Sequence, residues 1–257
     1  MRLPYVFILL SAFLLTQTPI AYAQTKEHIK LYTIAEFDAN GKEVPLSKTN
    51  LQLLSYIENQ ANIQFDLKRV PWKRAIESAL SGDGMLMGMS ITKERLQKFV
   101  FSEPINGNGN WLVTRCDRSF KFDRLEDLKG KTIGIVSGTS VGEEFDQQAN
   151  QLFQVEHDTG AGIARLQKLA INRVDALIWY GGISNAKEIE ESINRQYAQR
   201  KEKDATAFCV PSKPVSILTN HFAMKIDPLK NQVLQRISAA IIKGRKDGSL
   251  PALMNPS

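Results

Sequence analysis

The sequence predicts an α/β protein built from two successive blocks of alternating strands and helices. The blocks span residues 29–91 and 111–179, and in both of them short β-prone runs alternate with segments whose apolar residues recur every three or four positions. The apolar content of 43% is sufficient for real hydrophobic cores, and the length suits one large domain or two smaller ones. This composition excludes a disordered or fibrous protein.

The first block follows the order β-α-β-α-β. Strands are predicted over residues 29–34, 63–70 and 85–91. The last of them is mostly apolar, which is typical of a strand buried on both faces. A helix is predicted over residues 50–61, and a second helix opens at Pro71 and stops at Gly82, because proline is tolerated in a first helical turn.

The second block repeats this alternation. Strands are predicted over residues 111–114, 132–136 and 175–179. A short helix over residues 125–128 ends at Gly130, and a longer helix begins at about Val141, directly after the turn formed by residues 137–140. The apolar spacing of residues 163–170 indicates a further helix.

Three more elements complete the chain. Residues 188–203 have a helical but heavily charged pattern, which suits an exposed helix, and residues 215–224 are predicted to form a strand that returns across the molecule. A terminal helix is predicted with Asp227 as its N-cap and Pro228 in the first helical position, followed by apolar residues at every fourth position from Leu229.

Residues 1–23 have the three parts of a secretory signal peptide. Arg2 supplies the positive charge, residues 6–15 form a short apolar stretch, and Ala21-Tyr22-Ala23 fits the small-x-small rule for cleavage. The stretch is shorter than the roughly 20 residues needed to cross a bilayer. We therefore expect cleavage after Ala23, export to the periplasm and a soluble mature chain.

The charge pattern argues against a nucleic-acid partner. The 33 basic residues outnumber the 27 acidic ones only slightly, and the two signs are interleaved, as on solvated helix faces. His28, His157 and His221 are scattered, and neither cysteine lies at a ligand spacing from another metal-binding residue. No metal site and no cofactor is therefore predicted.

The two cysteines, Cys116 and Cys209, would both reach an oxidising compartment after export. An even count in an exported chain favours a disulfide, and the alternative is a pair of buried free thiols. Both residues lie in or beside β-prone runs of the second block, which could be neighbours in one sheet. We expect a bridge between them.

Five short motifs, taken in order, resemble a known family. They are residues 88–95 (GMSITKER), 101–104 (FSEP), 130–135 (GKTIGI), 137–139 (SGT) and 173–176 (RVDA). With the signal peptide, they span nearly the whole mature chain and are similar to the amino-acid type of periplasmic solute-binding proteins of ABC transporters. Each motif alone is common, but all of them in this order make a specific pattern.

The resemblance implies a two-lobed periplasmic-binding-protein clamp, in which each lobe is a mixed sheet flanked by helices and a two-stranded hinge joins them. The first lobe would comprise residues 24–108 and 214–257, and the second residues 109–213. The implied function is capture of a small polar carboxylate or amino-acid-like solute and its delivery to an inner-membrane ABC permease, by a monomer and without catalysis.

The resemblance also implies a set of ligand-binding residues in the first lobe. Arg95 would hold a carboxylate through its planar guanidinium, assisted by Ser90 and Thr92 of the same motif. The alternative role for Arg95 is a surface salt bridge with Glu94 or Glu103, which would be expected if the motif were absent. The family places an aromatic wall at Trp72, although a tryptophan at the start of a helix is more often a core residue. Weaker candidates in this lobe are Arg74, as a second positive charge, and Phe37, as a facing aromatic.

In the second lobe, the turn at residues 137–140 would present amide groups at a helix N-terminus, where anions bind favourably. Thr139 and Ser140 would then contact the ligand, or would only cap the helix. The spacing of a phosphate-binding P-loop is absent from this turn.

The strand after Asp175-Ala176 departs from the family pattern. The amino-acid binders usually end this strand in an aspartate that pairs with the ligand's α-ammonium, whereas this chain has Tyr180 there. A neutral phenol cannot neutralise an ammonium, so we expect a carboxylate without a free α-ammonium, with Trp179 or Tyr180 stacking on it. The alternatives are a shifted register or a Tyr180 that is simply a core residue.

Two other function classes stay open at this point. Cyclohexadienyl dehydratases resemble this fold and need a carboxylate acid or base in the cleft, for which Glu36 or Asp38 are candidates. The same two acids are the nearby candidates for pairing with a ligand ammonium. A soluble receptor that reports to a membrane sensor is the other possibility.

Overall fold

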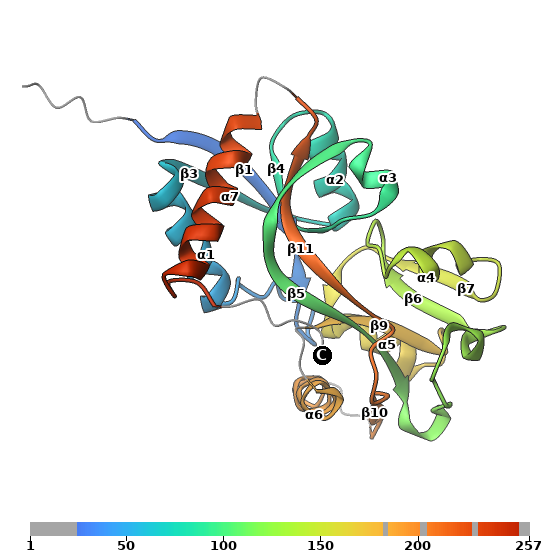
Figure 1. Ribbon diagram of the computed structural model, residues 1–257. Coiled ribbons are helices and arrows are strands. Elements are labelled where there is room, and N and C mark those ends of the chain that lie inside the picture. The colour runs from blue at the N-terminus through green and yellow to red at the C-terminus, as the bar shows by residue number, and fades with distance from the viewer. Residues whose placement is uncertain (1–24, 182–184, 201–204, 228–230, 252–257) are drawn as a thin grey trace, which may run out of the picture.

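The computed structural model describes residues 25–181, 185–200, 205–227 and 231–251. The predicted signal peptide and Pro228 lie outside these ranges. The chain forms two α/β lobes that are joined by two long neighbouring strands (Figure 1). Within the described ranges, none of the helices has both the length and the apolar character needed to cross a membrane.

The sheet of the first lobe is mixed. β1 (Glu27–Ile34) pairs in parallel with β3 (Ile63–Val70) and with β4 (Met85–Ser90), and β4 pairs antiparallel with β11 (Ser216–Lys225). Alternate residues of these strands point to opposite faces. Helices α1 (Lys48–Ala61) and α7 (Asn231–Lys246) cover one face, and α2 (Trp72–Leu80) covers the other.

The helices of this lobe begin at residues that can serve as N-caps. Ser47 caps α1, because its hydroxyl accepts a hydrogen bond from the Asn50 amide at 3.2 Å, and the helix ends at Asn62 in the left-handed conformation. Pro71 was predicted to be the first residue of α2. It is instead the N-cap, so the helix begins one residue later, at Trp72. α3 (Lys93–Leu96) is a single turn that is capped by the Thr92 hydroxyl.

The second lobe contains the other end of the same continuous sheet. β6 (Thr132–Val136) pairs in parallel with β7 (Gln154–Asp158) and β9 (Ala176–Gly181). α5 (Leu166–Ala170) and α6 (Ala186–Tyr197) pack on one face, and α4 (Glu143–Gln148) packs on the other. Three short 3-10 helices lie at Cys116–Arg118, Leu125–Leu128 and Ile163–Arg165.

The two lobes are connected by β5 (Phe99–Arg115) and β11, which pair antiparallel over most of the length of β11. In the resulting strand order, β3-β1-β4-β11-β5-β9-β6-β7, these two strands occupy the centre. They are the predicted two-stranded hinge. The prediction of a strand only at residues 111–114 was too short, because β5 begins at Phe99.

A second, minute sheet also links the lobes. β2 (Glu36–Phe37), in the loop after β1, pairs in parallel with β8 (Ala161–Gly162) of the second lobe. Gly162 has a φ of 96°, and a Cβ atom there would lie 2.2 Å from the Phe37 carbonyl oxygen. Only glycine therefore allows the two backbones to approach so closely.

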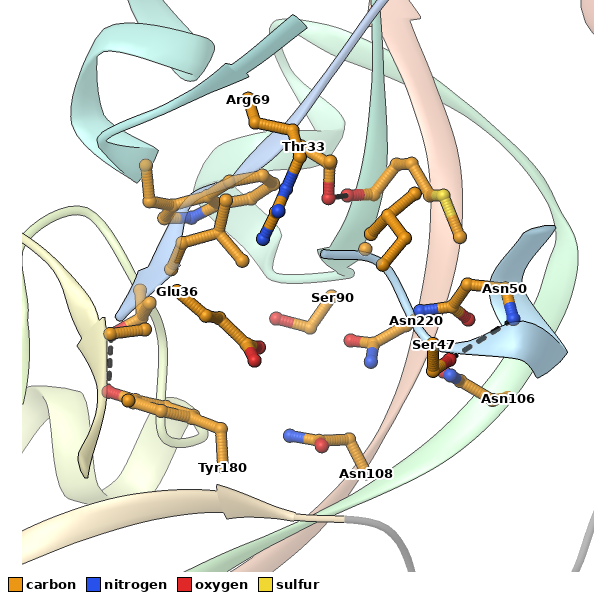
Figure 2. Close-up of a pocket in the computed structure, with 18 of the residues that line it drawn as sticks. Thr33, Glu36, Ser47, Asn50, Arg69, Ser90, Asn106, Asn108, Tyr180 and Asn220 are labelled. Carbon is orange, nitrogen blue, oxygen red and sulfur yellow. Dashed lines mark hydrogen bonds between the residues drawn. The ribbon is translucent and has the colours of Figure 1, made fainter. Parts of the chain in front are cut away.

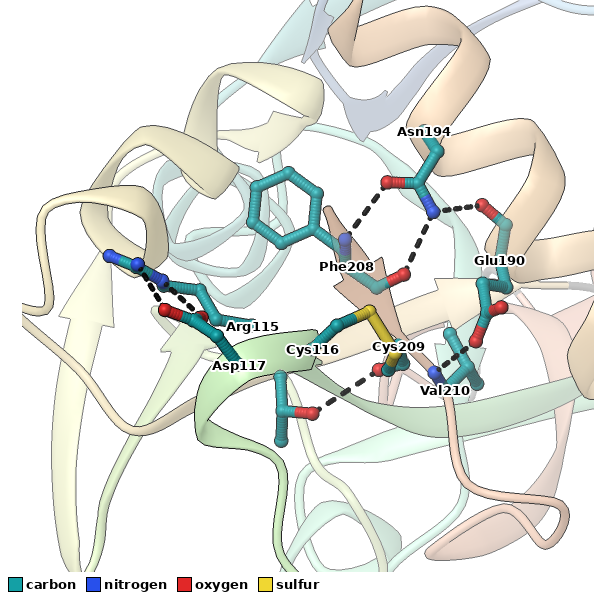
Figure 3. Close-up of a disulfide and its surroundings, with 9 residues drawn as sticks. Arg115, Cys116, Asp117, Glu190, Asn194, Phe208, Cys209 and Val210 are labelled. Atoms are coloured by element: carbon teal, nitrogen blue, oxygen red, sulfur yellow. Dashed lines mark hydrogen bonds and ion pairs between the residues drawn. A yellow bond between two sulfur atoms is a disulfide. The ribbon is translucent and has the colours of Figure 1, made fainter. Parts of the chain in front are cut away.

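The disulfide between Cys116 and Cys209 is confirmed, with 5.0 Å between the two Cα atoms. It joins the end of β5 to β10 (Phe208–Cys209), and β10 pairs antiparallel with β5 (Figure 3). The Asn194 side chain on α6 accepts a hydrogen bond from the Phe208 amide at 2.9 Å and donates one to the Phe208 carbonyl at 2.8 Å. Bridge and helix together fasten this short edge strand.

Candidate ligand-binding site

A cavity of about 520 Å³ lies between the two lobes and against the hinge strands. This volume suits a small organic molecule. Polar side chains from both lobes point into it (Figure 2). Seven of the residues predicted from the sequence line it: Trp72, Ser90, Arg95, Thr139, Ser140, Trp179 and Tyr180.

The other three predicted residues do not line the cavity. The Thr92 hydroxyl caps α3 by accepting from the Arg95 amide at 3.2 Å. Arg74 lies on the exposed face of α2. Phe37 belongs to β2, and its ring lies where a side chain on Gly160 would otherwise fit. The structure therefore does not place these three residues at the cavity.

Arg95 is held in place from both lobes. Its Nη1 donates to the Ser90 carbonyl and to the Ser90 hydroxyl, each at 2.8 Å, and its Nη2 donates to the Gly138 carbonyl of the second lobe at 2.8 Å. A guanidinium has five N–H donors, so two of them remain for a ligand. The predicted alternative, a surface pair with Glu94 or Glu103, is not formed within the described residues, and Glu94 pairs instead with Lys98 at 2.6 Å.

The electrostatics at Arg95 favour an anion. Burial lowers the pKa of its guanidinium, while the charges of Asp146 and Glu94 act in the opposite direction. Within the part of the chain that the structure describes, Arg95 forms no ion pair with a carboxylate. A partly buried cation whose hydrogen bonds all go to neutral oxygens gains from an anionic ligand.

The turn at residues 137–140 differs from its prediction. α4 begins at Glu143 rather than at about Val141, so the turn does not form a helix N-terminus. The carboxylate of Asp146 in α4 accepts from the Val141 amide at 3.1 Å and from the Ser140 hydroxyl. The Ser140 hydroxyl is therefore already engaged within its own loop.

Tyr180 lies at the cavity end of β9 and is bonded to the opposite turn. Its hydroxyl lies 2.6 Å from the Thr139 hydroxyl and accepts from the Val136 amide at 3.3 Å. Burial raises the pKa of the phenol, so Tyr180 stays neutral near pH 7. Among the described residues, Glu36 is the single acid that lines the cavity. Asp38 instead closes a turn by accepting from the amides of Asn40 and Lys42.

Arg165 also lines the cavity, but it is neutralised within the protein. Its Nε lies 2.6 Å from an Asp158 oxygen, and both side chains are 5% exposed. Its other nitrogens donate to the carbonyls of Ile178 and Gly134. The Arg165 guanidinium carbon lies 5.8 Å from the centroid of the Tyr180 ring, so Arg165 packs behind this side of the site. Arg95 is therefore the better candidate for holding an anion.

Sequence reasoning missed several polar residues that line the cavity. They are Thr33, Ser47, Asn50, Arg69, Asn106, Asn108 and Asn220. The pattern Asn-Gly-Asn-Gly-Asn over residues 106–110 was an available signal, because alternate residues of a strand share a face. Arg69 is partly engaged, since its Nη1 lies 3.0 Å from the Glu43 carboxylate and also donates to the Val44 carbonyl.

Comparison with known proteins identifies the family. Residues 48–256 match the model of the bacterial extracellular solute-binding proteins, family 3. The chain belongs to this family. This solute-binding protein thus has the two lobes, the hinge and the cavity between the lobes that its sequence predicted.

Two relatives are distant in sequence but cover most of the chain. The L-cystine-binding protein TcyJ of Escherichia coli is 22% identical over 86% of this chain and 77% of its own length. The histidine-binding periplasmic protein of the same species is 21% identical over 91% of this chain and 88% of its own length.

Among solved structures, an ancestral arginine-binding protein bound to arginine superposes with a TM-score of 0.67 at 20% identity, covering 88% of this chain and 95% of the other. At this identity the likeness shows the two-lobed fold of the solute-binding protein and leaves its ligand to be inferred from its own cavity.

Proposed function

We propose that this solute-binding protein captures a small carboxylate between its lobes in the periplasm and delivers it to an inner-membrane ABC permease. The observation that carries the proposal is Arg95, a partly buried cation at the cavity with two N–H groups to spare and no acidic partner among the described residues. The named relatives support it, because cystine and histidine both carry carboxylates.

The clamp would work by closing around its ligand. Arg95 reaches from the first lobe to Gly138 of the second, and the Lys93 ammonium lies 2.9 Å from the Glu143 carboxylate across the same gap. A ligand that contacts both lobes favours the closed arrangement. We place the lobe boundaries after residues 108 and 213, in β5 and just before β11, and we propose a monomer that begins at Gln24.

We further propose that the ligand lacks a free α-ammonium. Tyr180 lies at the end of β9, and its neutral phenol is already bonded to Thr139. An ammonium buried beside it would lose its hydration without gaining a counter-charge. The competing arrangement is an ammonium paired with Glu36, whose side chain points into the cavity (Figure 2).

The site favours a protein that binds its ligand without catalysing a reaction. Of the two acids that a dehydratase-like reaction could use, Asp38 is committed to its own turn and Glu36 is exposed. The matched family and the named relatives are binding proteins. An enzyme would be revealed by product formation from prephenate-like acids.

A thermal-shift screen of the mature protein tests the proposed function. The panel consists of matched acids with and without an α-ammonium, such as alanine and lactate, or glutamate and 2-oxoglutarate. A ligand at about one hundred times its dissociation constant adds roughly 2.7 kcal/mol to the free energy of unfolding, which is an easily measured shift. We expect the ammonium-free member of a pair to give the larger shift. If no carboxylate stabilises the protein, the proposal is wrong.

A further inference from the structure

Beyond the Arg95 end of the cavity, a row of polar side chains crosses three neighbouring strands. In the sheet register, Ser90 of β4 lies opposite Asn220 of β11, and Asn220 lies opposite Asn106 of β5. Residues that are directly opposite in neighbouring strands share a face. Neighbouring strands are about 4.8 Å apart, so the row extends roughly 10 Å from Ser90, which holds Arg95, to Asn106.

The carboxamides of this row, and that of Asn50 on α1, are free for a ligand. Within the described chain, the side chains of Asn50, Asn106 and Asn220 form no hydrogen bond. Figure 2 shows them together with Ser47 at one end of the cavity, apart from the guanidinium of Arg69 and the carboxylate of Glu36. The labelled side chains that gather at this end are therefore polar and uncharged.

Asn110, which also belongs to β5, shows what a purely structural role looks like in the same strand. The Asn110 carboxamide is fully buried and donates to the Ser216 hydroxyl at 2.8 Å and to the Val141 carbonyl at 3.4 Å. Asparagine and glycine are both unfavourable in strands, so residues 106–110 weaken the hinge sheet. Asn110 offsets part of this cost with protein hydrogen bonds, whereas Asn106 does not.

The chemistry of the row selects its ligand. A carboxamide offers two N–H donors and an acceptor oxygen, and a hydroxyl group can use both kinds of site. An apolar tail would leave these groups without partners, and a charged tail would lose its hydration without meeting a counter-charge. The row therefore fits neutral hydroxyl groups.

We propose that the asparagine row, formed by Asn220 and Asn106, binds a hydroxyl-rich, uncharged tail, so that the captured solute is a polyhydroxylated carboxylate of the aldonic or uronic acid class. This inference rests on the proposed function, because it takes the carboxylate to be held by Arg95. The two ends of such an acid match the two ends of the cavity. The cavity of about 520 Å³ has room for it.

Titration calorimetry with four probes tests the inference: D-gluconate, D-galacturonate, hexanoate and lactate. Hexanoate has a carboxylate and a tail of similar length without hydroxyl groups, and lactate is too short to extend from Arg95 to Asn106 at the far end of the row. We expect gluconate or galacturonate to bind at least about tenfold more tightly than hexanoate, because several neutral hydrogen bonds are gained.

The matched variants are Asn106→Ala with Asn220→Ala, and Asn59→Ala as the control. Asn59 is an exposed asparagine on α1, outside the cavity. The double variant should lose about tenfold in affinity for the sugar acid and should bind lactate like the wild type, whereas the control should change neither. A merely structural effect on the hinge would weaken lactate as well.

The outcomes separate the inference from the function on which it rests. Equal binding of hexanoate and the sugar acids, or an unchanged affinity in the double variant, overturns the inference. So does an amino acid that binds more tightly than every hydroxy acid, although the receptor function would stand. If none of the four acids and no amino acid binds, the proposed function itself has failed.

Discussion

Replacing Arg95 by alanine is expected to lower the affinity for carboxylate ligands by at least about a hundredfold. Two N–H groups of its guanidinium are available to the ligand, and hydrogen bonds between charged groups contribute about 1.5 to 3 kcal/mol each. The variant also removes the bond from Nη2 to the Gly138 carbonyl, which joins the lobes. Calorimetry with the acid that gives the largest thermal shift measures the loss.

Two further variants separate the roles of Arg95. Arg95→Lys keeps the positive charge but loses the planar fork, so it should recover only part of the affinity. Lys98→Ala removes an exposed cation of the same segment that pairs with Glu94, and it should leave binding unchanged. An Arg95→Ala protein that is folded and binds with wild-type affinity would remove Arg95 from the site.

Removing the disulfide is expected to lower the free energy of unfolding by about 2 to 5 kcal/mol. Cys116 and Cys209 are 93 residues apart in the sequence, and the chain-entropy model gives about 4.7 kcal/mol for a closed loop of about this length. Without the bridge, β10 keeps its pairing with β5 and its bonds to Asn194 on α6 (Figure 3). The second lobe should therefore fold but be less stable.

Equilibrium unfolding in urea of a Cys116→Ser, Cys209→Ser double variant measures this loss. Reduced wild-type protein provides the control, because it lacks the bridge but retains both native side chains, and it should show a similar decrease. Oxidised wild-type protein and the double variant should bind the ligand alike, since neither cysteine lines the cavity. If the free energy of unfolding falls by less than about 1 kcal/mol in both the double variant and the reduced wild type, the expected contribution is contradicted.

The sequence predicted those elements whose apolar period is strong. The strands at residues 63–70 and 132–136 coincide with β3 and β6, and the helix predicted over residues 50–61 matches most of α1. Pairs of two-residue strands such as β2 and β8 have no period to detect. The first two-thirds of β5 were missed because Pro104 and residues 106–110 are poor strand formers, and pairing with β11 overrides that preference.

The candidate site was predictable where a contiguous motif carries it. Ser90 and Arg95 lie within one short segment, and the structure places both at the cavity. The asparagine row was not predictable, because Asn106 and Asn220 are brought together only by the register of the hinge strands. Likewise, only the folded chain shows that Arg69 points into the cavity from the end of β3 (Figure 2).

The central claim is that the cavity holds a carboxylate on Arg95 and neutralises no α-ammonium. Glu36 is the acid on which an ammonium would depend, since Tyr180, which the sequence predicts to stand at the family's usual aspartate position, is a neutral phenol. Glu36→Gln removes this charge and retains a polar side chain of nearly the same shape. The most direct test is therefore the dissociation constant of the best-binding acid for the wild type and for Glu36→Gln.

If the ligand is an acid without an ammonium, Glu36→Gln should bind it as tightly as the wild type or more tightly, because a negative charge that repels the anion is gone. If the ligand's ammonium pairs with Glu36, the variant should lose about tenfold or more in affinity. The account predicts the first result, and the second result, obtained by calorimetry with a folded variant, would contradict it.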